Sequence, residues 1–214
     1  MKAMKKIASR IIQQIRTKRT SFWERVKAKQ VLELFQLVRK KVPAYQNFLI
    51  KHRVKVGRIK KVTDLELLPI ADKENYLRKY SLSELTTDGR LDKPLIFTST
   101  SGSTGVPFYF HRSFDLDWKT SVVHELFYLQ GYYKKNEPTL VIVCFGMGVW
   151  IGGMITYQAF HFLQERGYNV SVITPGINKQ EIFNSLKNLG DEYKNIILVG
   201  YPPFIKDVID EAPS

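Results

Sequence analysis

A chain of 214 residues with 44% hydrophobic residues is long enough to bury one ordinary core, and its composition excludes a low-complexity or fibrous protein. Its one cysteine, Cys144, excludes an internal disulfide, and its apolar neighbours favour a small buried side chain over a nucleophile. The net charge of +13 is uneven, because residues 1–61 hold 19 of the 33 lysines and arginines and only two acidic residues. The positive charge is therefore a property of one end of the chain.

The N-terminal residues 1–56 are predicted to be helical, because apolar residues recur at helical spacing among lysines and arginines. We interpret residues 1–61 as a basic helical arm and residues 62–214 as an α/β portion. A basic amphipathic first helix is typical of contact with an anionic membrane or with nucleic acid, although a solvated arm whose apolar stripe packs on the body is favoured. No signal peptide follows the basic start, so a cytoplasmic location is expected, with peripheral membrane attachment left open.

The rest of the chain begins with a connector at residues 64–70 and a short helix expected over about 73–80. Strands and helices then alternate, which predicts right-handed βαβ units and a mostly parallel sheet covered by helices on both faces. Strands are expected at 95–99, 107–111, 139–145, 169–173 and 195–199, and helices at 113–130, 149–165, 178–189 and from Pro202. Ser113 and Asn178 have the side chains and spacing of helix N-caps. The chain stops just past the last helix without a closing strand, so the fold is expected to be incomplete.

Residues 139–164 contain no Asp, Glu, Lys or Arg, which is long enough for a membrane-spanning helix. The start of this stretch is β-branched, however, and its middle contains four glycines. A buried strand, a glycine-rich turn and a buried helix are therefore favoured over a membrane span.

One loop carries the clearest chemical signal. Residues 98–105 read Thr-Ser-Thr-Ser-Gly-Ser-Thr-Gly and lie between two apolar strands, which argues against a flexible surface loop. Glycine lets the backbone approach a ligand, consecutive N–H groups form an anion-binding concavity, and hydroxyl groups donate to phosphate oxygens. The loop is not that of the P-loop NTPases, because Val106 and Pro107 follow its last glycine instead of Lys and Ser or Thr.

The order Ser-Gly-Ser-Thr-Gly-x-Pro resembles the phosphate-binding motif of the adenylate-forming superfamily, which includes acyl-CoA synthetases, adenylation domains and luciferases. Weaker similarities extend from about residue 30 to the end and point to the phenylacetate–CoA ligase-like branch. They lie in Asp64 to Ile70 with Lys73 and Glu74, in Phe145-Gly146-Met147-Gly148 with Gly152-Gly153, and in Gly200-Tyr201-Pro202-Pro203. The resemblance implies that the α/β fold corresponds to the N-terminal part of that superfamily's large domain.

The resemblance also implies a two-step reaction. A small carboxylic acid, aromatic in this branch, attacks the α-phosphate of ATP with Mg²⁺, and a thiol, usually coenzyme A, then displaces AMP. Matching positions assign the ATP phosphates to Thr100, Ser101, Gly102, Ser103, Thr104 and Gly105, where such a loop acts by positioning and electrostatic stabilisation. They assign the acyl pocket to Phe145, Gly146, Met147, Trp150 and Gly153. No catalytic residue and no metal ligand is assigned within the chain.

Two departures from the family pattern matter. Many members place a lysine beside the motif's proline, where this chain has Val106 and Phe108. The chain also stops before the motifs that bind adenine and ribose, the acidic residue linked to magnesium, the interdomain hinge and the C-terminal catalytic lysine. We therefore expect this chain alone to be a poor or inactive ligase that requires the C-terminal part of the same enzyme.

Three alternatives stay open. A dinucleotide-binding domain is disfavoured, because Gly152 comes one residue late after Gly146-x-Gly148, and the next strand ends in Ile173-Thr174-Pro175 instead of an acidic residue. A second alternative is a non-catalytic scaffold, or half of a split enzyme, with a basic arm. A third is an enzyme of the same superfamily that transfers the acyl group to an acceptor other than coenzyme A. The four histidines have no metal-ligand spacing, and no Gly-x-Ser-x-Gly elbow is present.

Overall fold

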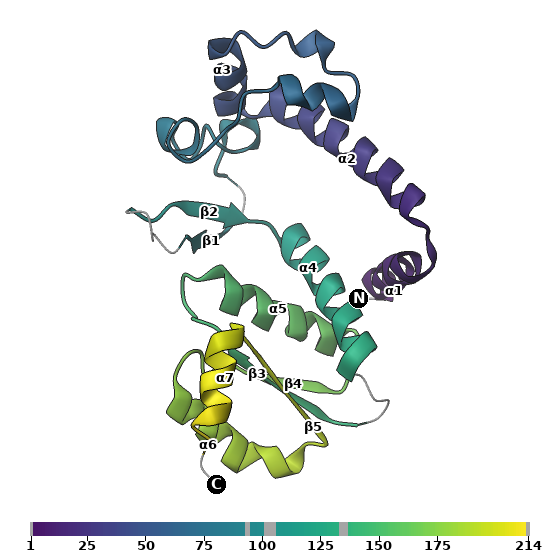
Figure 1. The fold of residues 1–214 in the computed structure, drawn as a ribbon, viewed down its shortest axis with the longest axis vertical. Helices are drawn as coiled ribbons and strands as arrows, with labels where there is room; N and C mark the ends of the chain where they lie inside the picture. Colours follow the sequence, from purple (N-terminus) through teal and green to yellow (C-terminus); the bar gives the residue numbers. More distant parts are fainter. Residues whose placement is uncertain (1, 93–94, 101–105, 133–136, 213–214) are drawn as a thin grey trace. The chain divides into compact units, whose positions relative to one another are not determined.

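The structure is a computed structural model that describes residues 2–92, 95–100, 106–132 and 137–212 (Figure 1). The chain forms two compact units, Arg16–Leu95 and a second one that combines Met1–Ile15 with Ile96–Ser214. These units differ from the division at residue 61 that the charge suggested, because the first helix packs with the α/β unit.

The unit of residues 16–95 begins with two α-helices, which confirms the helical structure expected up to residue 56. Helix α2 (Thr20–Lys41) and helix α3 (Pro43–Lys51) are followed by short 3-10 segments at Val56–Arg58, Val62–Leu67, Leu77–Lys79 and Thr87–Gly89. Their core contains Phe35, Leu49 and Ile59.

The helix expected over residues 73–80 is wrong: turns occupy 73–76, and only Leu77–Lys79 forms a 3-10 turn. The carboxylate of Asp72 accepts hydrogen bonds from the backbone N–H groups of Glu74 and Asn75, at 2.8 and 2.7 Å. Such local bonds offer the backbone an alternative to helical pairing.

The second unit contains two sheets. Strands β1 (Ile96–Ser99) and β2 (Tyr109–Arg112) form an antiparallel pair. Strands β3 (Thr139–Cys144), β4 (Val170–Ile173) and β5 (Asn195–Gly200) form a parallel sheet in the order β4-β3-β5 (Figure 1). The expected α/β class with a parallel sheet is confirmed, with the first two strands standing outside that sheet.

Helices cover both faces of the parallel sheet, because successive side chains of a strand point to opposite faces. Helix α5 (Ile151–Glu165) packs on one face, and helices α6 (Lys179–Leu189) and α7 (Pro202–Asp210) pack on the other (Figure 1). The first face buries Val141, Val143, Phe160 and Leu163, and the second buries Leu140, Ile142, Cys144, Ile182 and Val208. This two-sided burial explains why residues 139–164 lack charge. None of the described helices is both long and apolar enough to cross a bilayer.

Both predicted N-caps are present. The Ser113 hydroxyl accepts a hydrogen bond from the Leu116 N–H at 3.3 Å, at the start of helix α4 (Phe114–Phe127). The Asn178 side chain accepts one from the Glu181 N–H at 3.2 Å. Helix α4 ends at Phe127 and continues as a π-helical turn at Tyr128–Tyr132.

The apolar stripe of helix α1 (Lys2–Thr17) packs on the α/β unit. Ala8 and Ile12 are buried against Trp118 and Val122 of α4 and Phe162 of α5. The preferred interpretation of the first helix, a stripe packed on the body, therefore describes Ala8 and Ile12, whereas Ile7 and Ile15 of the same helix remain exposed.

Candidate functional site

The β1–β2 hairpin forms the stem of the hydroxyl-rich loop. Beyond the last strand pair, Ser99 with Tyr109, the Thr100 N–H donates to the Phe108 carbonyl and the Phe108 N–H donates to the Thr100 hydroxyl, both at 3.0 Å. A hydroxyl that accepts one bond retains its hydrogen to donate. Of the predicted phosphate-binding residues, Thr100 is therefore seen at the mouth of the stem, while Ser101, Gly102, Ser103, Thr104 and Gly105 lie outside the described residues.

The loop stem contacts the glycine-rich segment that follows β3. The Ser99 N–H donates to the Val149 carbonyl at 2.9 Å, and Ser99 forms a parallel bridge with Trp150. These residues are far apart in the sequence: Ser99 directly precedes the predicted phosphate-binding residues, and Trp150 was predicted to line the acyl pocket. The fold brings the two segments into direct backbone contact.

A groove of about 370 Å³ lies at this contact. It is lined by Ser99, Thr100, Phe110, Phe145, Gly146, Trp150, Ile151 and Gly152. Its lining is uncharged and mostly apolar, and its volume falls in the range of small-ligand sites. Phe145, Gly146 and Trp150 are three of the five residues predicted for the acyl pocket.

The other two predicted pocket residues, Met147 and Gly153, do not line the groove. Met147 packs against the core cluster on the α5 face of the sheet. Gly153 is buried, and a Cβ atom there would lie 2.5 Å from the Gly146 carbonyl oxygen and 2.6 Å from the Met147 sulfur. Glycine at position 153 thus allows the first turn of α5 to approach the backbone of the preceding turn.

Four lining residues were not among the predicted site residues: Ser99, Phe110, Ile151 and Gly152. Phe110 pairs with Thr98 in the hairpin. Because alternate residues of a strand share a face, the pattern Phe108-Tyr109-Phe110 could have indicated that Phe110 lies on the same face as Phe108. Ile151 and Gly152 are the first residues of α5, and the predicted start of this helix at 149 was two residues early.

The start of α5 gives the groove a positive end without a charged side chain. The N-cap residue Trp150 makes no side-chain capping bond, and the first turn contains no acidic residue. The first N–H groups of a helix lack intrahelical partners and carry partial positive charge. Since Ile151 and Gly152 line the groove, this end of the helix favours an anionic group there.

The groove lies at the carboxyl end of the central strand. Cys144, the last residue of β3, pairs with Gly200 at the end of β5, and the helices after these two strands cover opposite faces of the sheet. Open α/β sheets bind ligands where connections diverge in this way. The turn at Gly200–Pro203 therefore lies beside the glycine-rich segment, so three of the four segments behind the family resemblance meet in one unit.

Two buried ion pairs hold the elements around the groove. Arg112 at the end of β2 binds Asp117 of α4 at 2.8 Å, and their side chains are 1% and 3% exposed. Arg166, at the end of α5, binds Glu125 of α4 at 2.7 Å and donates to the Ser121 hydroxyl at 2.6 Å. Burial raises the pKa of Asp117, while the charge of Arg112 acts in the opposite direction. The pairs fasten the hairpin to α4 and α4 to α5.

Cys144 is not a candidate nucleophile. It is buried at the end of β3, and burial raises the pKa of its thiol to about 11. A thiol with such a pKa is neutral and unreactive at physiological pH. Among the described residues, no group of three or more His, Cys, Asp or Glu side chains is arranged to hold a metal ion.

Comparison of the chain with protein-family models and with curated proteins gave no match in either case.

Proposed function

We propose that this chain supplies the phosphate loop and part of the acid pocket of an ATP-dependent carboxylate-activating enzyme of the adenylate-forming type. The observation that carries the proposal is the contact of Ser99 with Val149 and Trp150. Acyl-adenylate formation requires a carboxylate beside the phosphates of ATP. A hydroxyl-rich loop whose stem borders an apolar groove provides the two neighbouring subsites that this reaction needs.

The proposed chemistry balances in two steps. A carboxylate oxygen attacks the α-phosphorus, the bond to pyrophosphate breaks, and an acyl-adenylate forms. A thiol then attacks the acyl carbonyl and AMP leaves with the carboxylate oxygen. In the first step, the loop's N–H and hydroxyl groups stabilise charge on the departing pyrophosphate. The apolar walls formed by Phe145 and Trp150 bind the body of the acid, and the start of α5 favours its carboxylate.

The groove fits some of the implied ligands better than others. Its uncharged lining suits the hydrocarbon part of a small acid. Mg²⁺ prefers oxygen ligands and commonly binds with substrate phosphates and one or two carboxylates, and no carboxylate lines this groove. Magnesium would therefore be held by the nucleotide and by residues outside the groove. No feature of the groove selects coenzyme A over another acceptor.

ATP binding tests the proposal directly. Trp150 lines the groove, so its fluorescence should report titration of the chain with Mg-ATP. Thr104→Ala and Gly102→Val should each weaken ATP binding tenfold or more, a change of about 1.4 kcal/mol. Thr63→Ala, which removes an exposed threonine hydroxyl in the helical unit, is the matched control and should leave the affinity unchanged.

Unchanged ATP affinity in both loop variants would contradict the proposal. Tighter binding of NADH than of ATP would instead favour a dinucleotide site at the same strand end. With the C-terminal part supplied, the loop variants should also lose acid-dependent pyrophosphate release.

A further inference from the structure

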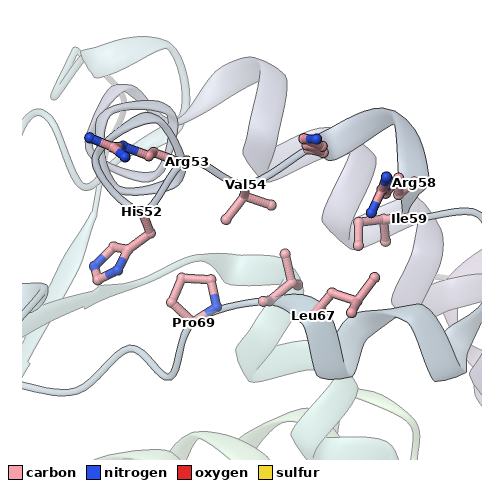
Figure 2. Close-up of a pocket in the computed structure, with 9 residues that line it drawn as sticks. His52, Arg53, Val54, Arg58, Ile59, Leu67 and Pro69 are labelled. Carbon is pink, nitrogen blue, oxygen red and sulfur yellow. The ribbon is translucent and has the colours of Figure 1, made fainter.

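A second groove lies within the helical unit, distant in sequence from the proposed ATP site. It has a volume of about 370 Å³ and is formed by two segments, residues 52–59 and 67–69. Figure 2 shows these segments on opposite sides of the opening, with Val54 and Ile59 on one side and Leu67 and Pro69 on the other. We call residues 51–70 the basic–apolar surface.

The basic–apolar surface carries an excess of positive charge. Its six lysines and arginines all lie between 51 and 61, and its two acidic residues, Asp64 and the exposed Glu66, leave it a net charge of +4. Arg53, Lys55 and Arg58 line the groove and are exposed, and no ion pair joins them to another residue that the structure describes. Asp64 accepts hydrogen bonds from the backbone N–H groups of Lys60 and Lys61, at 2.9 and 3.0 Å.

Large aliphatic side chains lie among these cations. Leu67 lines the groove and is 60% exposed, and Ile70 just beyond it is 86% exposed. Ile50, whose carbonyl accepts the Arg53 N–H, is 74% exposed. The neighbouring residues Leu65 and Leu68 pack inward on the core of the unit, so Leu67 is the outward-facing member of this segment.

This combination distinguishes between polyanionic partners. Single-stranded nucleic acids are bound by cations together with aromatic side chains on which bases stack, and the described lining of this groove contains no Phe, Tyr or Trp. Basic residues with exposed aliphatic side chains are the pattern of proteins that attach to a membrane interface. Each Lys or Arg near an anionic surface contributes about 1 kcal/mol, or about a fivefold change in partitioning.

We propose that the basic–apolar surface docks on an anionic lipid bilayer. Arg53, Lys55 and Arg58 contact the lipid head groups, and Leu67 and Ile70 enter the boundary of the acyl chains. We assign the docking to this surface and not to helix α1, because Ala8 and Ile12 of the α1 stripe are buried against α4 and α5 and only Ile7 and Ile15 of it stay exposed. Membrane attachment therefore depends on a different part of the basic N-terminal region from its first helix.

Vesicle sedimentation tests the proposal, with phosphatidylcholine vesicles that contain or lack phosphatidylserine. The wild-type chain should bind only the phosphatidylserine vesicles. The triple variant Arg53→Asn, Lys55→Gln and Arg58→Gln should bind them at least tenfold more weakly. Asparagine suits position 53, because Arg53 has a φ of 52° and asparagine tolerates the left-handed region.

The matched control removes the same charge from exposed lysines of the α/β unit: Lys187→Gln, Lys194→Gln and Lys206→Gln. It should change vesicle binding by less than about threefold, because these lysines are not part of the basic–apolar surface. Leu67→Ser keeps the charge and should still weaken binding several-fold. Circular dichroism should show all three proteins folded.

Three results would overturn the proposal. The first is no binding of the wild-type chain to phosphatidylserine vesicles. The second is equal loss in the triple variant and its control, which would indicate a response to net charge alone. The third is tight binding to DNA that the triple variant loses and Leu67→Ser retains, which would make the surface a nucleic-acid site.

Discussion

Replacing Gly153 by alanine sets two opposing effects of known size against each other. In a helix, alanine is more favourable than glycine by up to about 1 kcal/mol. At this position, however, the new Cβ would lie 2.5 Å from the carbonyl oxygen of Gly146 and 2.6 Å from the sulfur of Met147. The methionine side chain can move, but the carbonyl oxygen belongs to the backbone. Overpacking of this kind costs about 1–3 kcal/mol, so we expect the clash to win and Gly153→Ala to destabilise the fold by about 1–2 kcal/mol.

The adjacent glycine is the control. Gly152 lies in the same turn of α5, and a Cβ atom there would meet the Phe145 ring at 3.6 Å, an ordinary van der Waals distance. Gly152→Ala should therefore stabilise the fold by up to about 1 kcal/mol. Urea unfolding followed by circular dichroism measures both changes, provided that the free energy of unfolding depends on urea concentration with the same slope in the two variants. Midpoints that shift in the same direction for both variants would refute the role given to the close approach at Gly153.

Two further predictions concern buried groups. Asp117→Ala leaves the Arg112 guanidinium buried without its carboxylate and should lower the free energy of unfolding by about 3–5 kcal/mol. The double variant Arg112→Met with Asp117→Leu removes both charges and should recover most of that loss in the same urea assay. In the folded protein the pKa of the Cys144 thiol is about 11, whereas its ordinary value, which applies to the unfolded chain, is 9.0. The unfolded chain therefore loses this proton first, and the stability of the fold falls as pH rises from about 9 to about 11. The total effect is at most about 3 kcal/mol. It should appear as a pH-dependent difference between wild type and Cys144→Ala, and parallel stability curves would contradict it.

Much of the fold was predictable because local signals and burial agree. The strand at β3 is a run of apolar, mainly β-branched residues, and all six of its residues are buried. Ser113 and Asn178 cap their helices as short polar side chains are expected to do. The alternation of strands and helices then predicts a parallel sheet that is covered by helices on both faces.

The parts that were not predictable depend on contacts between distant residues. The stripe of α1 indicates a buried face, but sequence alone does not say that Trp118 and Phe162 bury it. The ion pair of Arg166 with Glu125 joins residues 41 positions apart, and isolated charged residues in a sequence give no sign of pairing. The same holds for the groove, since the bond from Ser99 to Val149 depends on how the hairpin meets the start of α5.

The uneven charge of the chain and its candidate ligand groove are separate features. Residues 16–95 carry 20 of the 33 basic residues but only nine of the 20 acidic residues, whereas the other unit is close to neutral. The groove beside the proposed phosphate loop has an uncharged lining, and the loop's flanks have Val106 and Phe108 where the motifs that it resembles often have lysine. Phosphate binding there would thus depend on backbone N–H groups and hydroxyl groups, which hold an anion by geometry, while the start of α5 favours the carboxylate of the acid. Arg53, Lys55 and Arg58 of the helical unit can then serve a different partner, and the exposed aliphatic residues near them indicate a lipid surface.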